Sequence, residues 1–163
     1  MKTLTLLLIG LILLAAIQGF AQSGTETFDT ITFTPPKGWE KNKFENKIVL
    51  LNGDRSCAIA IFKSRESSGS GEIDFKSEWQ EKVAKQYNTT VQPKMQNGLA
   101  AEGGTGEVLM GGANIESNGA KASVMLLVYR GFGRATSVLG LNPSKCEEEM
   151  VSFMSKVEVG KPR

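Results

Sequence analysis

Cys57 and Cys146 are the only cysteines in this 163-residue chain and form its only redox-capable pair. Each falls on an apolar stripe, the first in an expected strand and the second at the start of an expected helix. A disulfide between them would close a loop of about 90 residues and stabilise the fold by about 4 kcal/mol. The bridge would require the Cα atoms of the two cysteines to lie within roughly 7 Å of each other. The alternative is two separate buried thiols that act as small hydrophobic side chains.

The other residue types exclude most familiar catalytic machinery. The chain has no histidine, which removes Ser-His-Asp and Cys-His catalysis, His-ligated zinc and a histidine pH switch. It contains neither Cys-x-x-Cys nor Ser-x-x-Lys, and its glycine clusters at 103–106 and 119–121 do not match a phosphate-binding loop. The acidic run 147–149 suits the positive end of a helix dipole. We predict no enzyme activity, no catalytic residue, no cofactor and no metal site.

Two aromatic residues near turns carry the sharper functional hypothesis. Trp39 and Phe132, together with Arg130 and Arg134, could form a contact patch, because aromatic residues and arginine are enriched at protein interfaces. The competing interpretation is that Trp39 and Phe132 fold back as lids on the core, where large aromatic side chains usually lie.

The first 21 residues predict a secretory signal peptide. A positive Met1-Lys2 precedes an apolar run from Leu4 to Ile17, and small residues then favour cleavage between Ala21 and Gln22. An uncleaved anchor is the alternative, but the run is shorter than the roughly 20 residues that span a bilayer. We therefore expect an exported protein, periplasmic or extracellular, with no stable membrane span after cleavage. The even balance of 19 basic and 17 acidic side chains argues against nucleic acid as a partner.

The remaining chain reads as a flexible lead-in at 22–27, a single domain at 28–159 and a frayed C-terminus at 160–163. Strands are expected at 28–33, 47–51, 56–63, 102–110, from 115, at 121–130 and at 134–141. Asn52-Gly53 predicts a hairpin turn, and residues 89–98 read as a loop. Asp74 is the expected N-cap of a first helix, on which Glu78 and Lys82 form an i,i+4 pair.

A second helix should follow the capping box formed by Ser144 and Glu147. The strands at 56–63 and 121–130 are apolar on both faces, so both faces must be covered. Hairpin turns join them, which makes the sheet antiparallel. The sequence therefore predicts an α+β fold in which helices cover both faces of an antiparallel sheet, a three-layer α/β/α sandwich.

The pattern around the first expected strand pair resembles a known fold family. Phe33, Pro36 and Gly38-Trp39, followed by a middle helix, further strands and a C-terminal helix, look like the PsbP/Mog1-like fold. The segment from Phe132 to Asn142 and the closing helix also resemble small secreted bacterial proteins of unknown function. The resemblance covers most of 28–159 and implies no family active site. The glycines at 103–106 depart from the cleaner strand that it implies.

These observations together favour an exported, non-enzymatic domain that binds a protein or a cell-envelope component. The alternative is a small-ligand carrier, or an enzyme that works without histidine, with its site between sheet and helix.

Overall fold

The computed structural model describes residues 19–20, 24–100, 106–117 and 119–162. The expected signal peptide up to residue 18 and the cleavage site at Ala21–Gln22 lie outside the described residues. The strands are β1 (Gly19–Phe20), β2 (Glu26–Phe28), β3 (Ile31–Phe33), β4 (Glu40–Lys43), β5 (Lys47–Leu51), β6 (Ala58–Phe62), β7 (Arg65–Glu66), β8 (Lys94–Ala100), β9 (Gly106–Ser117), β10 (Ala120–Gly131), β11 (Arg134–Leu141) and β12 (Glu158–Val159). The helical segments are α2 (Gly71–Trp79), a π-helical turn (Gln80–Ala84), α3 (Lys85–Tyr87), a 3-10 turn (Pro143–Lys145) and α4 (Glu147–Met154).

The main sheet is antiparallel at every described pairing, in the order β1-β4-β5-β6-β11-β10-β9-β8, with β7 beside β11. Long hairpins β9–β10 and β10–β11 form its centre, and a second small sheet has the order β12-β3-β2. The predicted antiparallel α+β class is confirmed. Strands make up most of the regular structure.

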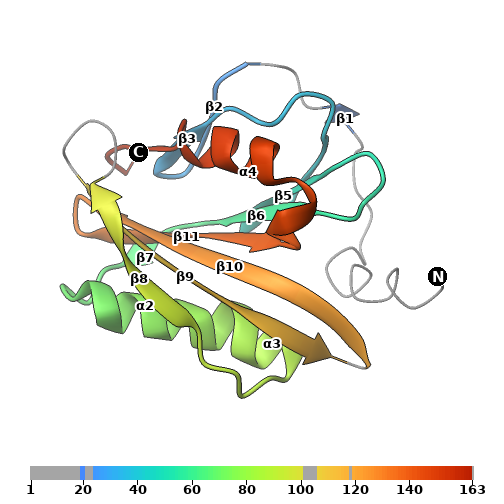
Figure 1. Ribbon diagram of the computed structural model, residues 1–163. Helices are drawn as coiled ribbons and strands as arrows, with labels where there is room; N and C mark the ends of the chain where they lie inside the picture. The colour runs from blue at the N-terminus through green and yellow to red at the C-terminus, as the bar shows by residue number, and fades with distance from the viewer. Residues whose placement is uncertain (1–18, 21–23, 101–105, 118, 163) are drawn as a thin grey trace.

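One face of the main sheet packs against the helical segment 71–87, which Figure 1 shows running along β9 and β10. Phe75, Trp79, Val83 and Tyr87 are each at most 4% exposed and belong to one core cluster with Leu126 and Val128. The predicted apolar stripe of this helix is therefore confirmed.

The opposite face carries a second core cluster. Met150 and Phe153 of α4 pack there with Ile31 and Phe33 of β3 and with Leu127 of β10. Figure 1 shows α4 and the small sheet on the side of the main sheet away from α2. Helix and small sheet together cover this face. The alternation predicted for 121–130, with even and odd residues on opposite faces, is what the two clusters show.

Several predicted boundaries are wrong for local reasons. The first helix begins at Gly71, because Ser70 rather than Asp74 is its N-cap and accepts a hydrogen bond from the Ile73 backbone N–H. The predicted capping box fails: residues 143–145 form a 3-10 turn and Cys146, whose side chain makes no cap, precedes α4. The strand expected to restart at 115 is instead one strand from Gly106 to Ser117, and β8 begins inside the expected loop at Lys94.

Candidate functional site

The end of the β10–β11 hairpin, residues 130–134, gathers three of the four predicted contact residues; we call it the hairpin tip. Phe132 lies at its apex with 41% of its surface exposed and a φ of 51°. A left-handed backbone is unfavourable for an aromatic residue, costing about 1–2 kcal/mol, whereas Gly133, at φ 73°, adopts it freely. Lys161 Nζ lies 5.9 Å from the centre of the Phe132 ring. The tip therefore presents an aromatic ring in a strained position with a cation beside it.

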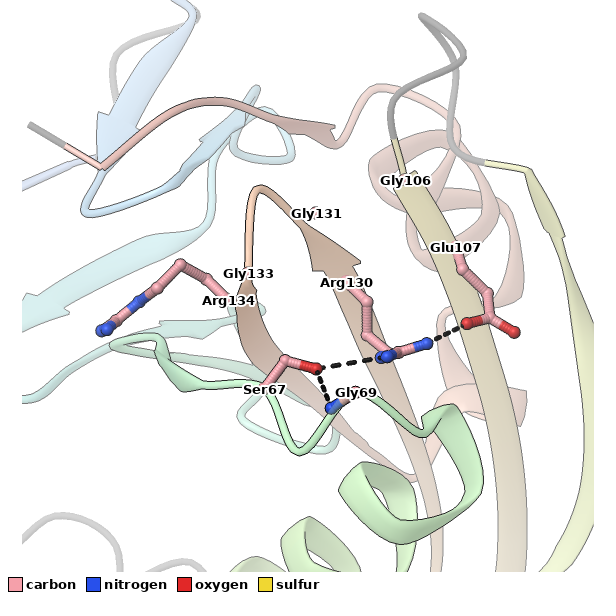
Figure 2. A pocket seen from close by; sticks show the side chains of 8 residues that line it. All are labelled: Ser67, Gly69, Gly106, Glu107, Arg130, Gly131, Gly133 and Arg134. Carbon is pink, nitrogen blue, oxygen red and sulfur yellow. Dashed lines mark hydrogen bonds and ion pairs between the residues drawn. The ribbon is translucent and has the colours of Figure 1, made fainter.

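Beside the tip is a surface pocket of about 380 Å³. Its lining comprises Ser67, Gly69, Gly106, Glu107, Arg130, Gly131, Gly133 and Arg134. Figure 2 shows the Arg130 side chain reaching across it, between Ser67 and Glu107, while the Arg134 side chain points away. Arg130 donates to the Glu107 carboxylate and, over 3.2 Å, to Ser67 Oγ. Arg134 donates to Ser64 Oγ at 3.1 Å and to the Ser64 carbonyl at 2.9 Å.

A buried carboxylate fixes Arg130 from below. Asp74 on α2 is fully buried and accepts hydrogen bonds from Arg130 Nε at 3.0 Å and Arg65 Nη1 at 3.1 Å. It also accepts from Ser67 Oγ at 2.5 Å and from the Ser68 backbone at 2.9 Å. Burial alone would raise the pKa of Asp74, but these hydrogen bonds outweigh it and lower the pKa to about 2. Asp74 is therefore an anion that holds two arginines.

A second carboxylate extends this network one helical turn along α2. Glu78, 5% exposed, accepts a hydrogen bond from Arg65 Nε at 2.5 Å and another from the buried Ser137 hydroxyl on β11. Arg65 lies on β7, which pairs with β11 at the foot of the hairpin tip. The predicted i,i+4 pair of Glu78 with Lys82 is wrong: Glu78 faces the sheet, and Lys82 lies 4.8 Å from the centre of the Phe62 ring.

Gly71 lets α2 approach this network closely. A Cβ at that position would lie 2.7 Å from Leu109 Cδ1 and 3.2 Å from Arg130 Nη1, so a larger residue would force the Leu109 and Arg130 side chains to shift. The network therefore ties α2, β7, β10 and β11 together beneath the tip.

The charged groups at this site are paired, with two guanidinium groups against three carboxylates. Arg65 and Arg130 face Asp74, Glu78 and Glu107, and each of these groups has a partner within 3.1 Å. Chemically, the arrangement can hold the hairpin tip in place, because each guanidinium and each carboxylate already has a charged partner. Within the part of the chain that the structure describes, no three Asp, Glu, Cys or His side chains are arranged to hold a metal ion.

Of the predicted contact residues, Trp39 does not belong with the others. It is 3% exposed and lies in the core cluster that also contains Phe33 and Ile48. Its placement in a surface patch is wrong, because the turn at 36–39 directs the indole into the space between the sheet and β3. The core-lid interpretation holds for Trp39 and fails for Phe132.

Sequence reasoning missed the buried network entirely. Asp74 and Glu78 flank the apolar stripe of Phe75 and Trp79 at a spacing of four residues, which places both carboxylates on one helix face. The sequence feature that indicates such a network is a pair of acidic residues next to an apolar stripe that is expected to be buried. Their partner Arg65 sits in a segment that reads as a serine-glycine loop.

The cysteine pair is resolved in favour of the bridge. Cys57 and Cys146 form a disulfide with Cα atoms 6.3 Å apart, and the two residues are 1% and 4% exposed. It joins the residue before β6 to the residue before α4.

No protein-family model and no curated protein sequence matches this chain. Among solved structures, a protein from Bacteroides thetaiotaomicron VPI-5482 is similar at 14% identity and a TM-score of 0.55. The match covers 86% of this chain and 50% of that one, so this chain spans half the length of the Bacteroides protein. At this identity the likeness shows a shared fold.

LpqN of Mycobacterium tuberculosis, described as involved in cell envelope biogenesis, is also similar, at 10% identity and a TM-score of 0.35. That match covers 85% of this chain and 83% of LpqN, and so low a TM-score carries no argument about this chain. Among the described helices, none has the length and hydropathy needed to cross a bilayer.

Proposed function

We propose that this chain is an exported, non-enzymatic domain that binds a protein or cell-envelope component through its hairpin tip. The observation that carries the proposal is Phe132, an exposed aromatic residue held at positive φ on a rigid base. Strained backbone persists where function selects it, and aromatic side chains dominate the energetics of protein interfaces. An asparagine at this position would fit the turn with less strain.

Two features support the wider proposal. A buried disulfide is typical of proteins in an oxidising compartment. Export directed by the predicted leader would place the chain in such a compartment. Among the described residues of the pocket, Arg130 is paired with Glu107 and Asp74, which disfavours a role for these carboxylates as a general base. The space between the helical segment 71–87 and the sheet is filled by Phe75, Trp79 and Val83, which disfavours a ligand site at that interface.

We also infer that the fold is PsbP/Mog1-like, with helices on both sides of the central sheet. The support is the packing of α2 and α4 residues in separate clusters on opposite faces. An experimental structure with a different strand order around β11 would contradict this assignment.

The binding proposal is tested by photo-cross-linking in the native host. A benzoylphenylalanine at position 132 should give a discrete adduct in the exported fraction, whereas the same group at Val151, 55% exposed on α4, should not. Equal adducts at both positions, or none at 132, would contradict the proposal.

A second measurement separates binding from stability. Phe132→Asn should leave the free energy of unfolding within about 1 kcal/mol of the parent, because relief of strain offsets the lost contact with Lys161. The same substitution should prevent the variant from competing for the cross-linked partner. If the variant is destabilised but still competes for the partner, Phe132 contributes to the stability of the fold and not to binding.

A further inference from the structure

Two lysines lie together at the open end of the β5–β6 hairpin. Lys47 is the first residue of β5 and lies directly opposite Phe62, the last residue of β6. Its Nζ is 5.5 Å from the centre of the Phe44 ring, and Lys82 Nζ is 4.8 Å from the centre of the Phe62 ring. Both lysines are half-buried. Two ammonium groups are therefore seated on neighbouring aromatic rings.

The core fixes these two rings. Phe62 is 7% exposed and belongs to the core cluster that contains Phe75, and Phe44 packs against the same cluster. The Phe44 backbone N–H donates to the Lys47 carbonyl at 2.8 Å, which closes the turn between β4 and β5. An aromatic ring attracts an ammonium group over its face. The fixed rings therefore hold the two positive charges near each other.

Neither ammonium group has a carboxylate partner. Within the residues that the structure describes, no Asp or Glu oxygen lies within 4 Å of Lys47 Nζ or Lys82 Nζ. Burial and, after it, the positive charge of Lys82 lower the pKa of Lys47, and no described carboxylate offsets them. Glu81, next to Lys82 in sequence, is paired with Lys85. Partly buried charges are normally paired, so this site lacks a counter-charge.

The position of Lys82 depends on the π-helical turn Gln80–Ala84, in which it lies. Backbone hydrogen bonds in such a turn join residues five apart, so Lys82 leaves the position beside Glu78 that an α-helix would give it. Glu78 is paired with Arg65 instead. Turns of this kind are rare and are frequent at functional sites. Here the turn keeps Lys82 away from the carboxylate that would neutralise it.

We propose that Lys47 and Lys82 form a binding site for a phosphate group. A phosphate monoester carries a charge of about −1.5 to −2 at pH 7, which matches two ammonium groups, whereas a carboxylate carries a single charge. Lysine binds phosphate as a point charge without a fixed geometry. A bound phosphate would supply the counter-charge that the described residues lack. The site shares no residue with the hairpin tip and does not depend on the binding proposed there.

The test titrates inorganic phosphate into the disulfide-bonded chain labelled with ¹³C at the lysine Cε. The signals of Lys47 and Lys82 should shift together and saturate at one phosphate per chain. Lys76, which is 67% exposed and paired with Glu72, should not shift. Phosphate should also raise Tm, because it binds the folded chain. Shifts of equal size at all three lysines would overturn the site.

Glutamine variants that each remove one positive charge supply the matched comparison. Lys47→Gln and Lys82→Gln should each weaken phosphate binding by about tenfold or more. Without phosphate neither should lower Tm, because relief of the repulsion between the two cations offsets the lost contact with a ring. Lys43→Gln, at an exposed position on the adjacent strand β4, should change the affinity by less than about twofold.

One result decides against the site even where a variant is unstable. Should Lys47→Gln unfold, Lys82→Gln is the deciding variant, because Lys82 lies outside the sheet. Unchanged phosphate affinity in folded Lys82→Gln would overturn the proposal and leave both lysines as partners of the aromatic rings alone.

Vesicles distinguish a lipid headgroup from a soluble phosphate compound, since phosphatidate presents a phosphate monoester at a membrane surface. Sedimentation with phosphatidate vesicles that inorganic phosphate reverses and Lys82→Gln abolishes would assign the site to a lipid headgroup. Saturable binding of inorganic phosphate without sedimentation would assign it to a soluble phosphate compound.

Discussion

Removing the Cys57–Cys146 disulfide should cost a large part of the stability of this domain. The two cysteines are 89 residues apart in sequence. In the chain-entropy model, closing a loop of that size lowers the entropy of the unfolded chain by about 15 cal/mol/K, or about 4–5 kcal/mol at 25 °C. Whole domains are stable by about 5–15 kcal/mol, so the loss should be plainly visible.

The assay is urea unfolding of the Cys57→Ala/Cys146→Ala variant and of the parent chain. Trp39 and Trp79 are each 3% exposed, so their fluorescence reports the loss of both core clusters. The slope with urea should rise in the variant, because its unfolded chain is less compact, and stability must therefore be compared as ΔG in water. For about 130 ordered residues, the same loss lowers Tm by about 15 °C.

A loss below about 1 kcal/mol, with both proteins unfolding in two states, would refute this reasoning. It would mean that the unfolded chain is already restricted without the bridge. Reducing the parent chain with a phosphine under the same conditions should reproduce the variant, which separates the cross-link from the small cavities left by alanine.

Three further outcomes are expected. The pKa of Asp74 is lowered to about 2 in the folded state, so its carboxylate stabilises the fold by about 2 kcal/mol above pH 4. This stabilisation is lost as the pH falls from 4 to 2. Urea unfolding at a series of acidic pH values should show no such loss for Asp74→Asn. Gly111→Ala would place a Cβ 2.7 Å from Phe75 Cζ and should lower Tm, with a loss of about 1–3 kcal/mol. Thr30→Val should lower the free energy of unfolding by about 1–3 kcal/mol, because the buried Thr136 hydroxyl, 2.8 Å away, loses its hydrogen-bond partner. In a double-mutant cycle, replacing both Thr30 and Thr136 by valine should recover most of that loss.

Each of these has a control in the same chain. Gly53→Ala, where a Cβ meets nothing within 4 Å, should change stability by less than about 0.5 kcal/mol. Asp54 is an exposed carboxylate, so Asp54→Asn should leave most of the loss of stability at low pH unchanged. A Thr30→Val variant as stable as the double variant would show that the hydroxyl pair contributes nothing.

The strand pattern was predictable because it depends on local chemistry. Alternation along 121–130 assigned Leu126 and Leu127 to opposite faces, and Asn52-Gly53 located the β5–β6 turn. Helix starts were less predictable, since Ser70 and Asp74 are both good N-caps and tertiary contacts decide between them. Here Arg65 and Arg130 hold the Asp74 carboxylate, which leaves Ser70 to cap the helix.

The candidate site was only partly predictable for the same reason. Arg130 and Arg134 are close to Phe132 in sequence, so their proximity follows from the hairpin turn. The network beneath them joins Arg65 to Glu78 and β7 to β11, and such long-range pairs follow from sheet order rather than from any local pattern. Trp39 follows a turn and Phe132 lies within one, and whether either ring points inward depends on packing that no local pattern specifies.

The position of β11 in the main sheet has a consequence for the order of events during synthesis. β11 lies between β6 and β10 and is the described link between the strands made early and those made late. The open edge of β6 can therefore be covered only once residue 141 has left the ribosome. Until then the first half of the chain has no complete sheet to join, so the main sheet can close only after β11 has been made.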